Sequence, residues 1–218
     1  MVAVLDAQFE VMRANLEGTI ADVDAEFLHD FRVATRRSRA VQRELKPAFP
    51  APELARFRAE FRWLQQATGA ARDLDVYVLE FESTRALVPE AFRPDLEPLL
   101  GVLRSRRLMA RREMVRALRS DRAGALWRDW PALLQELGAG RIDGGPAAGE
   151  PIGRVAGARI AKVYRRMVRS GRAIDDSSPP EALHELRKKG KELRYLLELF
   201  GAELYPSDVV KPMIKTLK

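Results

Sequence analysis

The 218-residue sequence contains no cysteine and only two histidines, His29 and His184. The absence of cysteine excludes disulfide bonds, thiol catalysis and thiolate metal sites, and it agrees with a reducing compartment. No stretch approaches the roughly 20 apolar residues of a membrane span. Near the N-terminus, Asp6 and Glu10 interrupt the apolar run that a signal peptide would need. We therefore expect a soluble, cytoplasmic protein with no membrane partner.

Strand signals are also nearly absent, because apolar residues recur at three- and four-residue steps instead of alternating. This periodicity predicts an all-α fold. Helices are expected over about 5–19, 24–47, 52–67, 73–86, 95–119, 123–137, 151–171, 181–200 and 207–218. Pro47 should end the second of these, and Asp73 could cap the fourth.

A stretch rich in glycine and alanine, residues 138–150, predicts a linker. It would separate a first helical bundle, residues 1–137, from a second, residues 151–218. The two halves together would form one domain.

Positive charge is in excess, with 38 Lys and Arg against 31 Asp and Glu, a formal net charge of +7 and an isoelectric point near 10.0. Such a balance favours polyanionic partners, namely nucleic acid, an acidic membrane surface or a phosphate polymer.

One motif occurs twice, as LHDFRVATRRSRA from Leu28 and LHELRKKGKELRY from Leu183. Aligning the two histidines, 155 residues apart, pairs His29 with His184, Arg32 with Arg187, Arg36 with Lys191, and Arg39 with Arg194. On a helix, offsets of 0, +3, +7 and +10 fall within a stripe roughly 80° wide. The same repeat would align Trp63 with the last residue, Lys218. Either the chain has been shortened, which would leave the second bundle incomplete relative to the first, or the second bundle completes itself in another way.

Two further helices carry basic residues at the same offsets. These residues are Arg159, Lys162 and Arg166 on one helix, and Arg104, Arg107 and Arg111 on the other. A single basic helix face is usually only solvated, but four matched stripes of like charge repel one another unless a ligand offsets the cost. We therefore predict an anion site in which the four stripes converge. Arginine and lysine suit phosphate oxygens, and no aromatic residues interrupt the first stripe as base stacking would require.

The strings LHDFRVATRRSRA, GAARDLDV and LHELRKKGKELRYLLE resemble the CHAD domain, the conserved-histidine α-helical domain, over nearly the whole chain. The resemblance implies two pseudo-symmetric four-helix bundles with basic residues lining a central pore or groove. It also implies binding of inorganic polyphosphate, for which phosphate or sulfate ions could substitute, and targeting to polyphosphate granules. The family is not known for catalysis, so the resemblance implies a binding module with no cofactor.

Matching the motifs position by position assigns the polyphosphate-binding residues. They are His29, Arg32, Arg36, Arg39, Arg72, Arg104, Arg107, Arg111, Arg159, Lys162, Arg166, His184, Arg187, Lys191 and Arg194. Arg72, in the Arg-Asp of the GAARDLDV string, could equally form a structural ion pair with Asp73 or Asp75.

Three rival interpretations stay open. A metal site would need more ligands than two histidines, and Asp30 and Glu185 should diverge from the adjacent histidines by about 100°. Phosphate hydrolysis or transfer would need metal-holding carboxylates or a nucleophile among the cations, so we expect no catalytic residue and no metal. Nucleic acid binding without sequence preference is the strongest alternative, because phosphate contacts alone would support it.

Overall fold

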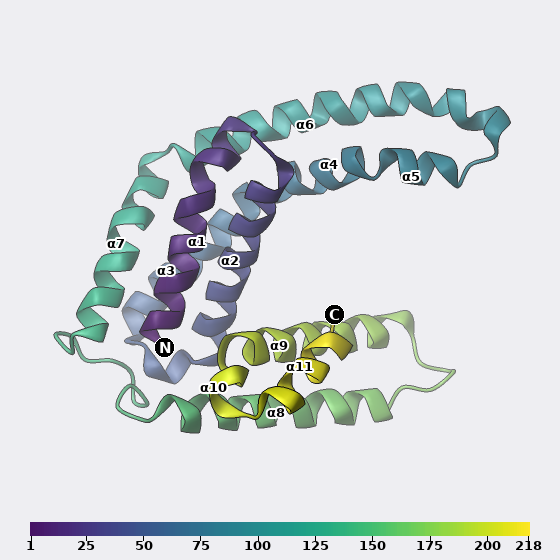
Figure 1. Ribbon diagram of the computed structural model, residues 1–218. Helices are drawn as coiled ribbons and strands as arrows, with labels where there is room; N and C mark the ends of the chain where they lie inside the picture. The colour runs from purple at the N-terminus through teal and green to yellow at the C-terminus, as the bar shows by residue number, and fades with distance from the viewer. The chain divides into compact units, whose positions relative to one another are not determined.

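The computed structural model describes residues 1–218, and every regular element in it is a helix (Figure 1). The α-helices are α1 Val2–Ala21, α2 Ala25–Glu44, α3 Ala51–Ala67, α4 Gly69–Leu79, α5 Phe81–Ala86, α6 Glu97–Leu118, α7 Asp121–Gly138, α8 Ile152–Arg172, α9 Pro180–Leu196, α10 Ala202–Leu204 and α11 Ser207–Thr216. Short 3₁₀ segments cover Lys46–Ala48 and Glu90–Leu96, and a π-helical segment, Leu197–Gly201, follows α9. The predicted all-α class is confirmed. None of the helices combines the length and the apolar character that crossing a membrane requires.

Most helix boundaries lie close to their predicted positions, but α4 begins earlier than predicted. It starts at Gly69, and Asp73 lies inside it instead of capping it. The preceding residue, Thr68, keeps a right-handed helical backbone, and its hydroxyl donates to Leu64 O of α3 at 2.9 Å. The chain therefore passes from α3 into α4 with hardly a break, and the interruption comes later, at Glu80.

The chain folds into two compact units. The first, here called the α4–α6 unit, consists of Asp6–Arg36 and Phe57–Leu134. The second, the α8–α9 unit, consists of Met1–Leu5, Arg37–Arg56 and Gln135–Lys218. Residues 37–56 thus join the C-terminal segment, whereas the sequence grouped them with residues 1–137. The predicted pseudo-symmetry of two bundles stays a prediction.

Aromatic side chains fill the core of the α4–α6 unit. Trp127 contacts Phe9 and Phe31, with ring centroids 5.6 and 6.0 Å apart. Trp130 is fully buried and lies 4.8 Å from the ring of Phe57. Rings of this size bury the most apolar area per residue, so they account for much of the stability of the bundle.

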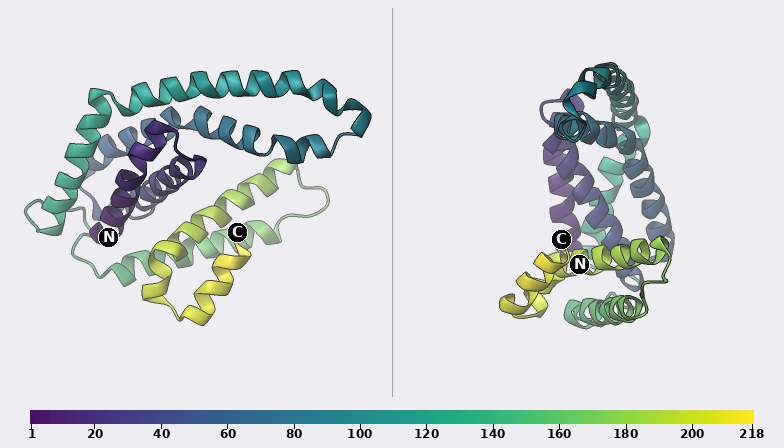
Figure 2. Two further views of the ribbon diagram at one scale, coloured as in Figure 1. Left: turned by 45° about the horizontal axis from the view of Figure 1, so that its top comes forward. Right: turned by 90° about the vertical axis from the view of Figure 1, so that its right-hand side faces the viewer.

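In the same unit, α6 runs alongside α4, and the chain between them turns back through α5 and the Glu90–Leu96 segment (Figures 1 and 2). Packing against α4 fixes which side of α6 is buried. Leu100, Met114 and Leu118 lie on that side. The basic stripe predicted for α6 therefore lies close to α4 at some positions and in solvent at others.

The α8–α9 unit is built on the pairing of α8 with α9, joined by a turn at residues 173–179 (Figure 2). Ile160 and Val163 of α8 and Leu193 of α9 are buried. The segment predicted as a linker, 138–150, lies between α7 and α8, and Gly145 meets the 3₁₀ segment so closely that a Cβ there would lie 2.3 Å from Pro47 O. Only glycine fits this position without a shift of the backbone.

Candidate anion-binding site

Arg32, the second residue of the first motif, is tied to the end of α3. Its Nη1 donates to Gln65 O at 2.8 Å and to Thr68 Oγ1 at 2.7 Å. Burial, and then the positive charge of Arg36, lower the pKa of the Arg32 guanidinium, but an arginine still stays charged. Arg32 therefore has a structural role at the α3 C-terminus and also contributes positive charge to this surface.

His29 is held by Arg72 of α4. Arg72 Nη2 lies 2.9 Å from His29 Nδ1, and Arg72 Nη1 donates to Ala25 O at 3.3 Å. A guanidinium can only donate, so Nδ1 must accept and the ring proton of the neutral imidazole must lie on Nε2. His29 is thus held in the orientation and tautomer of an Nε2–H donor. Neither Asp73 nor Asp75 pairs with Arg72.

Arg36, one turn beyond Arg32, is exposed and forms no ion pair. His29, Arg32, Arg36 and Arg72 form what we call the α2 group. Arg36 and Arg72 both lower the pKa of Arg32, as like charges close together do, and the exposed Asp73 offsets them only in part. Arginine charge therefore exceeds acidic charge around Arg32.

Beside the α2 group, donor atoms of Glu26, His29 and Asp30 lie within 4.8 Å of one another. Asp30 was predicted to point away from His29 because adjacent helical residues diverge by about 100°, yet a carboxylate oxygen of Asp30 lies within 4.8 Å of a ring nitrogen of His29. The two ring nitrogens of His29 are already committed, one as acceptor from Arg72 and one as N–H. His29 therefore has no free lone pair for a metal in this arrangement.

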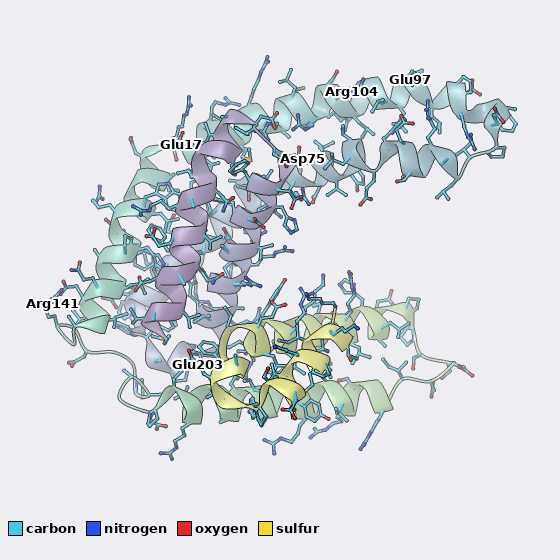
Figure 3. The ribbon with its side chains drawn as sticks, viewed as in Figure 1. Glu17, Asp75, Glu97, Arg104, Arg141 and Glu203 are labelled. Atoms are coloured by element: carbon cyan, nitrogen blue, oxygen red, sulfur yellow. The ribbon has the colours of Figure 1, made fainter.

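Two of the three arginines predicted on α6 are neutralised. Arg107 Nε donates to Asp75 Oδ1 at 2.6 Å, and its Nη2 donates to Asp22 Oδ1 at 2.7 Å. Arg111, 6% exposed, pairs with Asp22 at 3.0 Å and donates to Thr19 O at 2.7 Å. Asp22 has a left-handed backbone, φ 57°, in the turn after α1. Arg107 and Arg111 hold this turn and α4 against α6, which leaves Arg104 as the exposed cation of the stripe (Figure 3).

In the α8–α9 unit, Arg159 is also neutralised. It pairs with Glu44, whose side chain is fully buried at the end of α2, and with Glu192 Oε1 of α9 at 3.2 Å. Arg43 pairs with Glu44 as well. Glu44 thus neutralises a basic residue of α8 that is 115 residues away in the sequence.

Arg194 is partly neutralised. Glu198 of the π-helical segment accepts from Arg37 Nη2 at 3.0 Å and lies 3.7 Å from Arg194 Nε. The guanidinium of Arg194 also lies over the ring of Tyr195, 5.2 Å from its centroid. One carboxylate thus serves two arginines, and the aromatic ring beside the stripe is already covered by a cation.

Five other predicted residues of this unit form no ion pair. Lys162, Arg166, His184 and Arg187 are exposed, and Lys191 is half-buried. Arg187, Lys191 and Arg194 border a cavity of about 400 Å³ with an apolar floor that includes Leu186. We call Lys162, Arg166, Arg187 and Lys191 the α8–α9 group. Arg39, half-buried on α2, belongs to the same unit.

The family model described as the CHAD domain matches residues 3–218. The chain belongs to the CHAD domain family. The family predicted from the two His-containing motifs is thereby confirmed, and CHAD domains are associated in general with polyphosphate binding.

Two uncharacterized proteins from two strains of Mycobacterium tuberculosis are similar to this CHAD domain. Each is 32% identical over 178 residues, which cover 81% of this chain and 34% of the relative. The chain therefore matches about a third of the length of these curated relatives.

Solved structures show the same fold. The crystal structure of the CHAD domain from the plant Ricinus communis has a TM-score of 0.80 and 24% identity, covering 99% of this chain and 69% of that one. PptA from Streptomyces chartreusis has a TM-score of 0.71 and 17% identity, covering 99% and 78%. At these identities the likeness supports the fold alone.

Three acids that neutralise predicted cations were not identified from the sequence. Asp22 and Glu44 lie outside the motifs, Glu192 lies within the second motif, and each contacts its arginine only in the folded chain. Asp75 lay within the quoted string GAARDLDV, but its partner is Arg107 of α6 and not Arg72.

Proposed function

We propose that this CHAD domain binds inorganic polyphosphate through the α2 group and the α8–α9 group, and that it leaves the polymer chemically unchanged. The supporting observation is a contrast between stripes. On α6 the motif arginines Arg107 and Arg111 are balanced by acids, whereas the cations of the α8–α9 group and Arg36 have no acidic partner. Unbalanced rows of like charge cost stability, and a polyanion offsets that cost.

The donors suit phosphoryl oxygens. Arginine offers a planar fork, lysine a compact charge, and His29 a fixed Nε2–H. Each unit of polyphosphate carries anionic oxygens, so a long chain can satisfy many such donors. Base stacking would need open aromatic faces among the cations. On α8 and α9 the aromatic residues are Tyr195, with Arg194 over its ring, and the exposed Tyr164. The match of many donors to phosphoryl oxygens is therefore what favours polyphosphate over nucleic acid.

The proposal is for binding without catalysis. As an Nε2–H donor whose Nδ1 accepts from Arg72, His29 is arranged to bind an anion and not to accept a proton from an attacking water. Binding of this kind would bring the protein to polyphosphate granules in the cytoplasm.

Calorimetric titration with long-chain polyphosphate tests the proposal. The variant Arg36→Glu combined with Arg187→Glu should lose at least about hundredfold in affinity, since each charge-assisted hydrogen bond contributes about 1.5–3 kcal/mol and two are removed. Arg36 is chosen over Arg32 because Arg32 also supports the end of α3. By analogy with counterion release from nucleic acids, affinity should also fall linearly with the logarithm of salt concentration.

A control variant makes the same change in net charge away from the motif helices, namely Arg13→Glu on α1 combined with Lys211→Glu on α11. It should retain binding. An equal loss in both variants would show that only net charge matters. Displacement of polyphosphate by duplex DNA or tRNA at matched phosphate concentration would support nucleic acid as the ligand instead.

A further inference from the structure

Two carboxyl groups from different helices meet at one arginine in the α8–α9 unit. Arg159 of α8 donates from Nε to Glu44 of α2 and from Nη2 to Glu192 of α9, the latter at 3.2 Å. The Glu44 side chain is fully buried, and that of Glu192 is 18% exposed. Arg43, also from α2, pairs with Glu44 and is half-exposed. The cluster thus holds two acids and two guanidinium groups with little access to water.

Because both carboxyl groups accept from the same guanidinium, Glu44 and Glu192 lie close together, and two ionised carboxylates that share a site disfavour each other. Burial first, and then the charge of Glu44, raise the pKa of Glu192, while Arg43 and Arg159 oppose that change. These three residues are charged groups close to Glu192 on the neighbouring helices. Glu192 therefore binds a proton more readily than a free glutamate does.

We infer that polyphosphate binding by the α8–α9 unit is coupled to proton uptake at Glu192, so that the affinity rises as the pH falls. This inference rests on the proposed function. With both acids ionised, the charges of Arg43 and Arg159 are fully offset. With Glu192 protonated, one positive charge is left over in the cluster. Arg159 lies one turn from Lys162 on α8, and Glu192 follows Lys191 on α9, so the cluster is carried by the same two helices as the α8–α9 group.

The coupling is reciprocal. A polyanion placed against the α8–α9 group disfavours the ionised form of Glu192, and protonation of Glu192 favours the polyanion by the same factor. Because one proton is involved, the affinity can change by at most about tenfold per pH unit. We expect a total change of about three- to tenfold as the pH falls through the range in which Glu192 gains its proton, at the low end of ordinary coupling between two sites.

The experiment is calorimetric titration of the whole chain with long-chain polyphosphate in two buffers of different ionisation enthalpy. The difference in heat gives the number of protons taken up per binding event. Long chains are used because only their terminal phosphates titrate near neutral pH. The variant is Glu192→Gln, in which the amide can still accept from Arg159 and donate to Glu44. The control is Glu185→Gln on the same helix, because Lys188 holds the pKa of the exposed Glu185 below its usual range.

In a series of titrations from high to low pH, wild type and Glu185→Gln should take up a fraction of a proton more than Glu192→Gln does. Glu192→Gln should also bind more tightly than wild type at the high end of the series, with the two converging at the low end. Both histidines are present in all three proteins, so the difference isolates Glu192. Equal proton uptake in wild type and Glu192→Gln, or none in wild type, would refute the coupling alone. A lack of binding at every pH would instead refute the proposed function.

Discussion

Replacement of Arg107 by methionine should destabilise the α4–α6 unit strongly while leaving polyphosphate binding almost unchanged. Arg107 contacts Asp75 at 2.6 Å and Asp22 at 2.7 Å, and the Asp75 side chain is only 1% exposed. Methionine keeps much of the length and apolar surface of the side chain but removes its charge. The carboxylate of Asp75 would then be buried without its partner.

The size of the effect follows from the burial of the two partners. Removing one member of a fully buried ion pair costs about 3–5 kcal/mol. Here the Arg107 side chain is 27% exposed, so water can enter where the guanidinium was, and Asp75 can bind a proton. We therefore expect a loss of about 2–3 kcal/mol, which corresponds to about 5–10 °C in the melting temperature for a chain of this size.

Thermal and urea unfolding followed by circular dichroism measure this loss. The matched control is Arg104→Met on the same helix, where the arginine is exposed and forms no ion pair, and its stability should change by less than about 0.5 kcal/mol. Asp75→Asn completes a double-mutant cycle with Arg107→Met, and the two losses should be far from additive. Equal melting temperatures for Arg107→Met and Arg104→Met would refute the structural role of Arg107, and a large loss of polyphosphate affinity in folded Arg107→Met would return that residue to the binding site.

Three further predictions concern other parts of the molecule. Gly145→Ala should lower the melting temperature by several degrees, because its Cβ would lie 2.3 and 2.5 Å from two carbonyl oxygens. Gly149→Ala is the control and should not lower it, because a Cβ there would have no neighbour within 4 Å. Equal melting temperatures for the two variants would contradict the close packing of this segment. Arg72→Met should release His29 from the single Nε2–H tautomer, visible as averaged ring nitrogen shifts in NMR spectra, and unchanged shifts would show that Arg72 does not select the tautomer. Because the folded-state pKa of Glu192 is raised, its contribution to stability is fully present below the unfolded pKa and is lost as pH rises through the folded pKa. Relative to wild type, Glu192→Gln should therefore gain stability above that range, and parallel stability curves from pH 4 to pH 8 would exclude a shifted Glu192.

The cations of the motif have two different roles, and their spacing in the sequence does not show which residue has which role. Arg32 and Arg187 occupy equivalent positions in the two copies, yet Arg32 bonds to the end of α3 while Arg187 is exposed at the edge of a cavity. Arg159 and Lys162 are one turn apart on α8, yet only Arg159 is paired with acids. A site list read from the stripes alone therefore mixes residues that support the fold with residues open to a ligand.

Local chemistry determined the helical class, most helix ends and the family. Three- and four-residue periodicity distinguishes a helix from a strand, and Pro47 prevents α2 from continuing. The family could be identified because the two His-containing motifs are contiguous strings of sequence. Only the tertiary structure decided which charges stay free. The acids lie far in sequence from the arginines they neutralise, at 85 residues for Asp22, 32 for Asp75 and 115 for Glu44. The periodicity of a single helix cannot predict contacts between residues so far apart. Electrostatic balance depends on distance in space, so the free cations could be identified only once α4, α6, α8 and α9 had been packed against their neighbours.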